Sequence, residues 1–127
     1  MGRAAETEGH IREAFRLSPR DIFSYSWMQI VGWSKFQLGA YAEAVGWLRR
    51  SIEANRNYPL AHFQLAGALA LLGSLDEART AALAGLALNP NYTIRRQRDT
   101  KFSDNPAYLA ARERHFEGLR LAGVPEG

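Results

Sequence analysis

The sequence repeats itself at a spacing of 34 residues, and this repeat constrains the fold more than any other feature. Shifting the chain by that spacing superimposes two groups of identical residues. One group is centred on a glycine, with Gly39 over Gly73, and the other is rich in asparagine, with Asn55 over Asn89. Because glycine commonly ends a helix and asparagine is common in turns, the two groups mark the turns of a repeated helix-turn-helix unit.

The second copy of the unit shows how each helix begins and ends. Leucines at helical spacing run through its first half, and we expect Gly73 to end that helix with a positive φ. Ser74 and Glu77 form a capping box, in which the serine hydroxyl accepts from the Glu77 amide and starts the second helix. In the first copy Ala40 replaces this serine, so we expect that helix start to be weaker by about 1 kcal/mol.

The chain outside the two copies contains one partial unit and one terminal helix. Residues 11–19 are typical of the second helix of a further unit, whose first helix is missing from this sequence. After Tyr92 the period fails, and residues 93–103 are polar and basic, which fits either a short helix or a loop. Asp104 or Asn105 then caps a helix that has Pro106 at its first position. We expect this amphipathic helix to cover the exposed end of the array.

The period and the order of the turns resemble the tetratricopeptide repeat (TPR) family. Small residues stand where that family packs its helices closely, as at Gly32, Ala44, Ala66 and Ala78. Most of the family's aromatic positions are replaced, and Arg56 stands where the family has proline. The resemblance implies an all-α fold, a TPR-like right-handed α-α superhelix with a C-terminal capping helix.

These observations predict one structural domain with four parts. They are the second helix of an incomplete repeat at 1–20, a TPR-like repeat at 21–57, another at 58–92, and a linker with the capping helix at 93–127. The expected helices span residues 4–17, 21–38, 41–54, 59–72, 75–88 and 105–121.

The end of the chain carries a second resemblance. The segments 103–114, 117–120 and 122–126 are similar to the C-terminal end of certain bacterial multidomain proteins. In those proteins a class III adenylate/guanylate cyclase domain, or a winged-helix DNA-binding domain, precedes a TPR array. This resemblance implies a non-catalytic scaffold, the C-terminal regulatory segment of a larger signalling protein. The alternatives are a regulatory or dimerisation part of a nucleotide cyclase, and the effector segment of a winged-helix transcriptional regulator.

The residues themselves give no sign of catalysis. Cysteine is absent, and His10, His62 and His115 fall on three different predicted helices without the spacing of a metal site. Neither GxGxxG nor GxxxxGK occurs, so a phosphate-binding loop is not expected. No apolar run approaches the ~18 residues of a membrane span, and no secretory signal is recognisable. We therefore expect a cytoplasmic chain that is not an enzyme, with no cofactor, no metal and no membrane partner.

The TPR resemblance also implies a peptide-binding face, because the first helices of TPR units line the concave side. We call the residues that this register selects the predicted face, and we expect a protein or peptide partner there. The competing interpretation is that the aromatic residues of the first repeat belong to the core, to packing between repeats or to the cover of the missing upstream helix. These aromatic residues are Trp27, Trp33, Phe36 and Trp47. The predicted face consists of Ser26, Gln29, Trp33, Phe36, Gln37, Leu60, Phe63, Gly67, Ala70 and Leu71.

A local excess of positive charge follows the second repeat. The net charge of the whole chain is only +3. The cluster has no interleaved aromatic residues and lies beside Asp99 and Asp104, so a solvated connector is favoured over a surface for nucleic acid or another anion. The cluster consists of Arg95, Arg96, Arg98 and Lys101.

The helix predicted over 4–17 lacks its usual partner, and we therefore predict a concentration-dependent homodimer. Burying a side chain such as Phe15 stabilises a contact by ~1.5–3 kcal/mol, and a few of them approach the roughly −8 kcal/mol of micromolar association. The substitution Phe15→Asp should shift the population towards monomer in sedimentation velocity. A dimer untouched by this substitution would contradict the prediction.

Overall fold

The computed structural model describes residues 24–100 and 103–127, and every regular element in these residues is a helix. The all-α class is thereby confirmed. The predicted helix over 4–17 and Lys101 lie outside the described residues. The helices are α2 (Ser24–Gln37), α3 (Tyr41–Ala54), α4 (Pro59–Leu71), α5 (Leu75–Leu88), α6 (Ile94–Arg98) and α7 (Pro106–Leu121).

The predicted helix ends agree with the structure to within one residue wherever the structure describes them. Glycine turns explain this agreement. Gly39, Gly73 and Gly123 each follow a helix and have φ values of 80°, 87° and 89°. Residues with a Cβ adopt this region only at a cost, so glycine at these positions ends the helix at a defined place.

The predicted capping box at Ser74 is wrong. The Ser74 side chain makes no hydrogen bond to the start of α5. Its backbone has φ −84° and ψ 65°, nearly the same as Ala40 at the start of α3, with φ −85° and ψ 67°. Both helices begin through the carbonyl of the cap residue, which accepts from the amide four residues later at 2.9 Å. The expected difference in strength between the two helix starts therefore has no basis in a side-chain cap.

A side-chain cap does form at the terminal helix. The Asn105 side-chain oxygen accepts from the amides of Ala107 at 2.9 Å and Tyr108 at 3.3 Å, and Pro106 occupies the first turn. Asn105 is thus the cap residue of the two that the sequence allowed. The segment after Tyr92 contains the short helix α6, one of the two expected alternatives.

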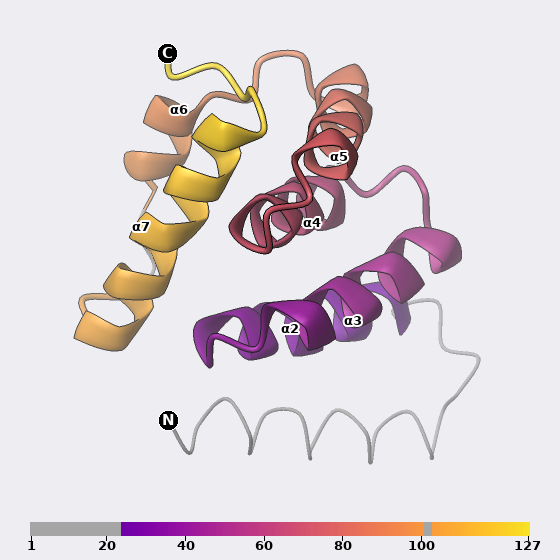
Figure 1. Ribbon diagram of the computed structural model, residues 1–127, viewed down its shortest axis with the longest axis horizontal. Coiled ribbons are helices and arrows are strands. Elements are labelled where there is room, and N and C mark those ends of the chain that lie inside the picture. Colours follow the sequence, from indigo (N-terminus) through magenta and orange to yellow (C-terminus); the bar gives the residue numbers. More distant parts are fainter. Residues whose placement is uncertain (1–23, 101–102) are drawn as a thin grey trace.

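The first four described helices pack in chain order, α2 on α3, α3 on α4 and α4 on α5 (Figure 1). Helix α4 is the centre of the fold, because ten consecutive residues from Ala61 to Ala70 are buried. A helix that is covered on every side needs to be apolar or small on every side. The sequence of α4 meets this condition with alanine, leucine, glycine and phenylalanine at most positions.

Helix α7 supplies the last cover for α4 and also contacts α2. Figure 1 shows it inclined steeply to α2 and α3. The two backbones approach closely where Gly118 meets Gly67. A Cβ atom at Gly118 would lie 2.5 Å from the Gly67 carbonyl oxygen, so no side chain fits there. The sequence predicted this helix and its ends, but the expectation that it covers the exposed end of the array is wrong, because the helix lies on α4 and α2.

Helix α6, helix α7 and the C-terminal residues are joined to one another, and we call residues 94–100 and 103–127 the C-terminal unit. The amides of Ile94 and Arg95 donate to the carbonyls of Pro125 at 3.0 Å and Glu126 at 2.8 Å. The Arg112 guanidinium of α7 donates to several carbonyls at the end of α6, including that of Arg98 at 2.6 Å. These bonds hold α6 and the C-terminal residues against α7.

The close contact between α4 and α7 predicts a strong effect of a small substitution. In Gly67→Ala the new methyl group would lie 2.4 Å from the His115 ring, so we expect a loss of about 1–3 kcal/mol of unfolding free energy. The matched control is Gly46→Ala on α3, where a Cβ meets nothing within 4 Å. This control should gain about 0.5–1 kcal/mol, because alanine favours a helix. Urea unfolding followed by circular dichroism measures both, and equal effects would contradict the packing.

Candidate functional site

Helix α7 covers much of the predicted face. The His115 ring of α7 meets Trp33 edge-on, with ring centroids 5.4 Å apart and planes at 76°. It meets Phe36 in the same way, at 5.5 Å and 85°. Trp33 and Phe36 also stack on each other, with centroids 5.1 Å apart. Trp33 and Phe36 of the predicted face therefore form an aromatic surface on which the His115 ring of α7 packs.

His115 is buried at this contact, with only 6% of its surface exposed. Its Nε2 atom lies 3.2 Å from the Phe63 carbonyl oxygen, close enough for a hydrogen bond. Burial lowers the pKa of His115 to about 4, and the hydrogen bond to Phe63 offsets only part of this effect. The imidazole is therefore neutral at neutral pH. The sequence favoured a structural or surface role for the histidines over a metal or catalytic site, but it did not identify the partners of His115. Its position on the apolar stripe of α7, between Ala111 and Leu119, is the signal of a packing role.

Arg114, the residue before His115, joins α7 to the first helix pair. Its Nε atom donates to the Tyr41 hydroxyl at 2.9 Å, and its Nη2 atom donates to the Gln37 carbonyl at 3.3 Å. Gln37 is thus the third residue of the predicted face that α7 contacts. Helix α7 also contacts Phe63 through His115, and Gly67 through Gly118.

The remaining residues of the predicted face have mixed environments. Phe36, Phe63 and Ala70 belong to the hydrophobic core, which agrees with the competing interpretation for Phe36. Ser26 and Leu71 are half-buried, and Leu60 is exposed. The ring of Phe63 stacks on Tyr92, with centroids 3.6 Å apart, on the side of α4 towards the end of α5. The structure therefore divides the predicted face into a covered part and an open part.

Three residues of the predicted face, Gln29, Trp33 and Leu60, line a pocket of about 370 Å³. We call it the glutamine pocket, because two glutamines of neighbouring repeats line it. Residues of α2, α4, α6 and α7 form its walls, together with two residues just beyond α5 and α6. These lining residues are Gln29, Trp33, Leu60, Gln64, Tyr92, Gln97, Thr100, Tyr108, Arg112, His115 and Phe116.

A buried pair of amides joins α2 and α4 in this pocket. Gln29 Nε2 donates to Gln64 Oε1 at 2.7 Å, and each residue is only 6% exposed. The Tyr58 hydroxyl donates to Gln29 Oε1 at 3.4 Å. Gln29 was predicted, whereas Gln64 was missed because the register selected its neighbour Phe63. Two glutamines 35 positions apart, one beyond the period, are a signal that sequence analysis could have used.

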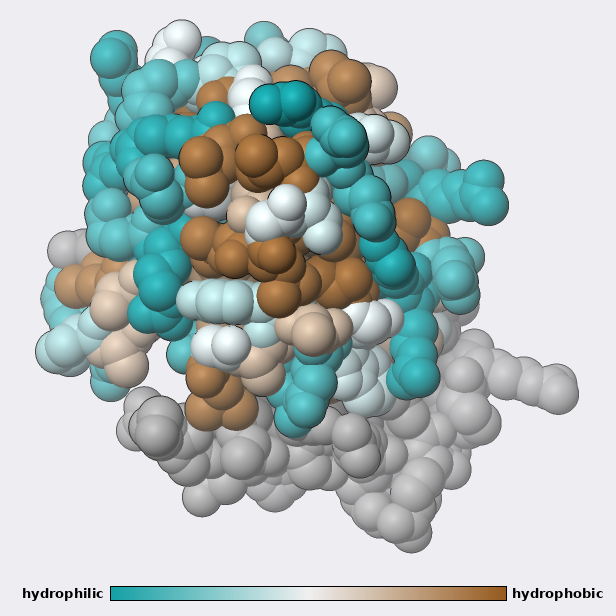
Figure 2. Space-filling model, viewed as in Figure 1, coloured by the Kyte–Doolittle hydropathy of each residue, from teal (hydrophilic) through white to brown (hydrophobic). Residues whose placement is uncertain are grey.

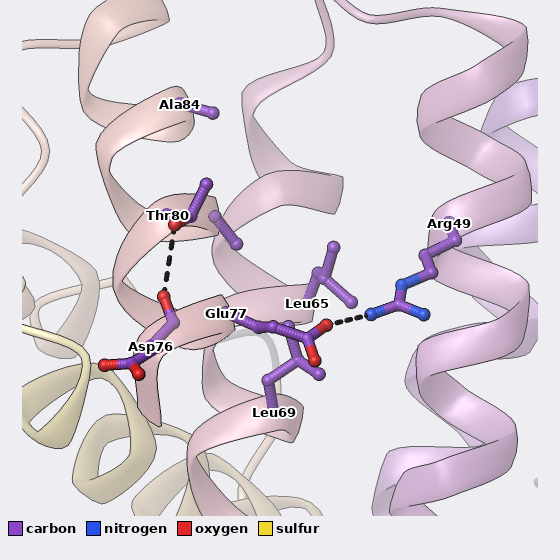
Figure 3. A pocket seen from close by; sticks show the side chains of 8 residues that line it. Arg49, Leu65, Leu69, Asp76, Glu77, Thr80 and Ala84 are labelled. Atoms are coloured by element: carbon purple, nitrogen blue, oxygen red, sulfur yellow. Dashed lines mark hydrogen bonds and ion pairs between the residues drawn. The ribbon is translucent and has the colours of Figure 1, made fainter. Parts of the chain in front are cut away.

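A second hollow of about 350 Å³ lies between α3 and α5 and contains no residue of the predicted face (Figure 3). Leu65 and Leu69 of α4 lie beneath an ion pair that connects α3 to α5. In this pair Arg49 and Glu77 are 2.5 Å apart, and both side chains are more than half exposed. The pair joins the two repeats across their surface, and at that exposure it stabilises them by about 1 kcal/mol at most.

Figure 2 shows hydrophobic side chains gathered in the middle of one side of the molecule, with hydrophilic residues on both flanks. Among the exposed large hydrophobic residues, Leu83 of α5 is 67% exposed, Leu72 is 46% and Leu121 is 44% exposed. Single exposed leucines are ordinary on a protein surface, so these exposures alone do not mark an interaction site.

The described residues of the basic cluster lie on α6. Arg95, Arg96 and Arg98 are all exposed. Arg98 forms an ion pair with Glu113 of α7, and its guanidinium lies 4.7 Å from the centre of the Phe116 ring. Arg98 is therefore engaged inside the C-terminal unit.

In comparisons with known proteins, no family model matches the chain, and no curated protein matches it in sequence. In the described part of the chain, no helix is long and apolar enough to cross a bilayer. A search of the same residues for groups of three or more His, Asp or Glu that could hold a metal ion finds none.

The buried imidazole predicts that acid weakens the fold. Below pH 6.5 the histidine of the unfolded chain takes up a proton, whereas folded His115 stays neutral until about pH 4. The unfolded state thus binds more protons, and the unfolding free energy should fall by about 2 kcal/mol between pH 7 and pH 5 from this group. His115→Gln, which keeps a hydrogen-bond donor without a titrating group, is the control. Urea unfolding of both proteins at the two pH values should show the extra loss only with histidine.

Proposed function

We propose that this chain is a non-catalytic protein-interaction module that binds a segment of a partner protein on the predicted face. The observation that carries the proposal is the glutamine pocket. It joins two consecutive repeats, and it combines aromatic walls with a buried amide pair. A mostly apolar pocket with a few fixed polar groups is the usual form of a binding site.

The groups around the glutamine pocket favour an uncharged, extended or helical peptide segment. Trp33 and Tyr108 offer flat apolar surface, and an amide such as that of Gln64 has the same donor and acceptor groups as a peptide bond. Arg112 is the charged side chain among the described lining residues. Its Nη2 atom already donates to the carbonyls of Arg98 and Thr100 at 2.6 Å. A peptide with neutral side chains therefore fits better than an acidic one.

The two sequence resemblances extend this proposal. In a TPR-like superhelix the predicted face would be concave, and the module would serve as the regulatory segment of a larger cytoplasmic signalling protein. A dimerisation part of a nucleotide cyclase and the effector segment of a winged-helix regulator are the alternatives. The open reading frame upstream of this segment in its gene distinguishes the three, since each requires a different preceding domain.

Selection of peptides from a random phage library against the purified chain tests the binding function. Leu60 is 38% exposed at the glutamine pocket, so Leu60→Asp should weaken binding of the selected peptides by at least about tenfold. Leu83→Asp is the matched control, because Leu83 is also exposed but does not line this pocket. Fluorescence anisotropy measures both affinities.

Two results would refute the proposal. One is that no peptide is selected above the level of an unrelated helical protein. The other is that Leu60→Asp leaves the affinities unchanged while Leu83→Asp abolishes them, which would move the binding site to the outer surface of α5.

A further inference from the structure

One face of α7 makes the contacts with the two repeats. The buried residues of this helix recur at helical spacing, with Ala111, His115 and Leu119 on one side. Glu113 and Glu117 on the other side are exposed. Such an amphipathic helix seated on an apolar surface is the helix-in-groove mode by which many proteins recognise partner helices. Helix α7 therefore occupies the predicted face in the way that a partner helix would.

Two ion pairs of the C-terminal unit, by contrast, are internal. Arg98 of α6 pairs with Glu113 of α7, and Arg120 pairs with Glu126 at 2.8 Å. The backbone bonds from Ile94 to Pro125 also lie within the unit. When the unit leaves the repeats as one body, it retains these interactions. What it gives up are the hydrogen bonds of Arg114, the contacts of His115 and Gly118, and the burial of apolar side chains such as Phe116 and Leu119 in the core that they share with α4.

From these observations we propose that α7 is a replaceable occupant of the predicted face, and that the partner which replaces it is an amphipathic helix with a glycine at the crossing point. The glycine is required because a Cβ at the position of Gly118 would lie 2.5 Å from the Gly67 carbonyl oxygen. The inference rests on the proposed function, since it assigns the partner and its regulation to the same face.

The partner helix also needs a ring three residues before its glycine. In α7 this ring is His115, which meets Trp33 and Phe36 edge-on and places Nε2 3.2 Å from the Phe63 carbonyl. An aromatic or imidazole ring of similar size can pack on the same surface of Trp33 and Phe36. The glutamine pocket stays open while α7 is in place, so an incoming segment can make its first contacts there, next to α7.

A partner helix can bind only the fraction of molecules from which α7 has left. The apparent affinity for such a helix is therefore the intrinsic affinity reduced by that fraction. A change that weakens the hold of α7 without altering the face must strengthen the binding of a helix added from outside. Tighter binding of an added helix after the contacts of α7 are weakened therefore distinguishes a replaceable helix from a fixed part of the core.

The experiment uses the full chain and a fluorescein-labelled peptide with the sequence of residues 103–127. Arg114→Ala removes the hydrogen bonds to Tyr41 and Gln37 and leaves the predicted face intact. We expect this variant to bind the peptide at least about tenfold more tightly than the wild-type chain in anisotropy titrations. Arg79→Ala is the matched control, because Arg79 pairs with Asp76 of its own helix, and it should bind like wild type.

A second peptide and a second variant complete the test. The same peptide with Gly118→Val should bind at least about tenfold more weakly, because its side chain collides with α4. Tyr41→Phe removes the acceptor of Arg114 Nε without a change of volume, and it replaces Arg114→Ala if circular dichroism shows that the latter unfolds.

Equal affinities for the wild-type, weakened and control chains would overturn the inference, and so would equal binding of the two peptides. Tighter binding of the α7 peptide to the weakened chain, together with failure of the peptide selection, would support a replaceable helix and reject the proposed function. Binding of selected peptides at the glutamine pocket, together with equal affinities of the α7 peptide for all three chains, would support the proposed function and overturn the inference.

Discussion

The contact between Gly67 and Gly118 determines how the rest of this protein is arranged. Two helices can approach this closely only where both lack a side chain, and this approach lets α7 complete the cover of α4. Because α4 is then enclosed by α3, α5 and α7, its ten consecutive buried residues can all be apolar or small, or hydrogen-bonded. A larger side chain at either glycine would separate the helices and expose the centre of the fold.

The same contact connects stability to binding. By lying on α4, helix α7 covers Phe36 and the carbonyl of Phe63, and it leaves the glutamine pocket open beside it. One surface therefore serves two purposes, since the residues that would hold a partner also hold the end of the chain. His115 couples this surface to pH. Between pH 6.5 and about pH 4 its buried ring remains neutral, whereas an exposed histidine would be charged.

Much of the fold could be predicted from local signals. Gly39 and Gly73 fix where two helices end through a backbone conformation that depends on neighbouring atoms alone. The proline and asparagine before α7 act in the same local way. The capping box at Ser74 failed because a side-chain hydrogen bond also depends on the ψ angle of its residue, and that angle is not specified by the residue types. Within the predicted face, the register taken from the resemblance selected Gln29, Trp33 and Leu60, which line the glutamine pocket.

The sequence by itself determined the helical class, the 34-residue unit and the ends of the helices, because each depends on residues within a few positions of one another. Only the tertiary structure decided that α7 lies on α4 and α2, and that Gln64 joins Gln29 in a buried pair. Phe63 and His115 are 52 positions apart, and no periodicity of either helix specifies that they meet. Such pairings result from the shapes of whole helix surfaces, which exist only once the helices have packed.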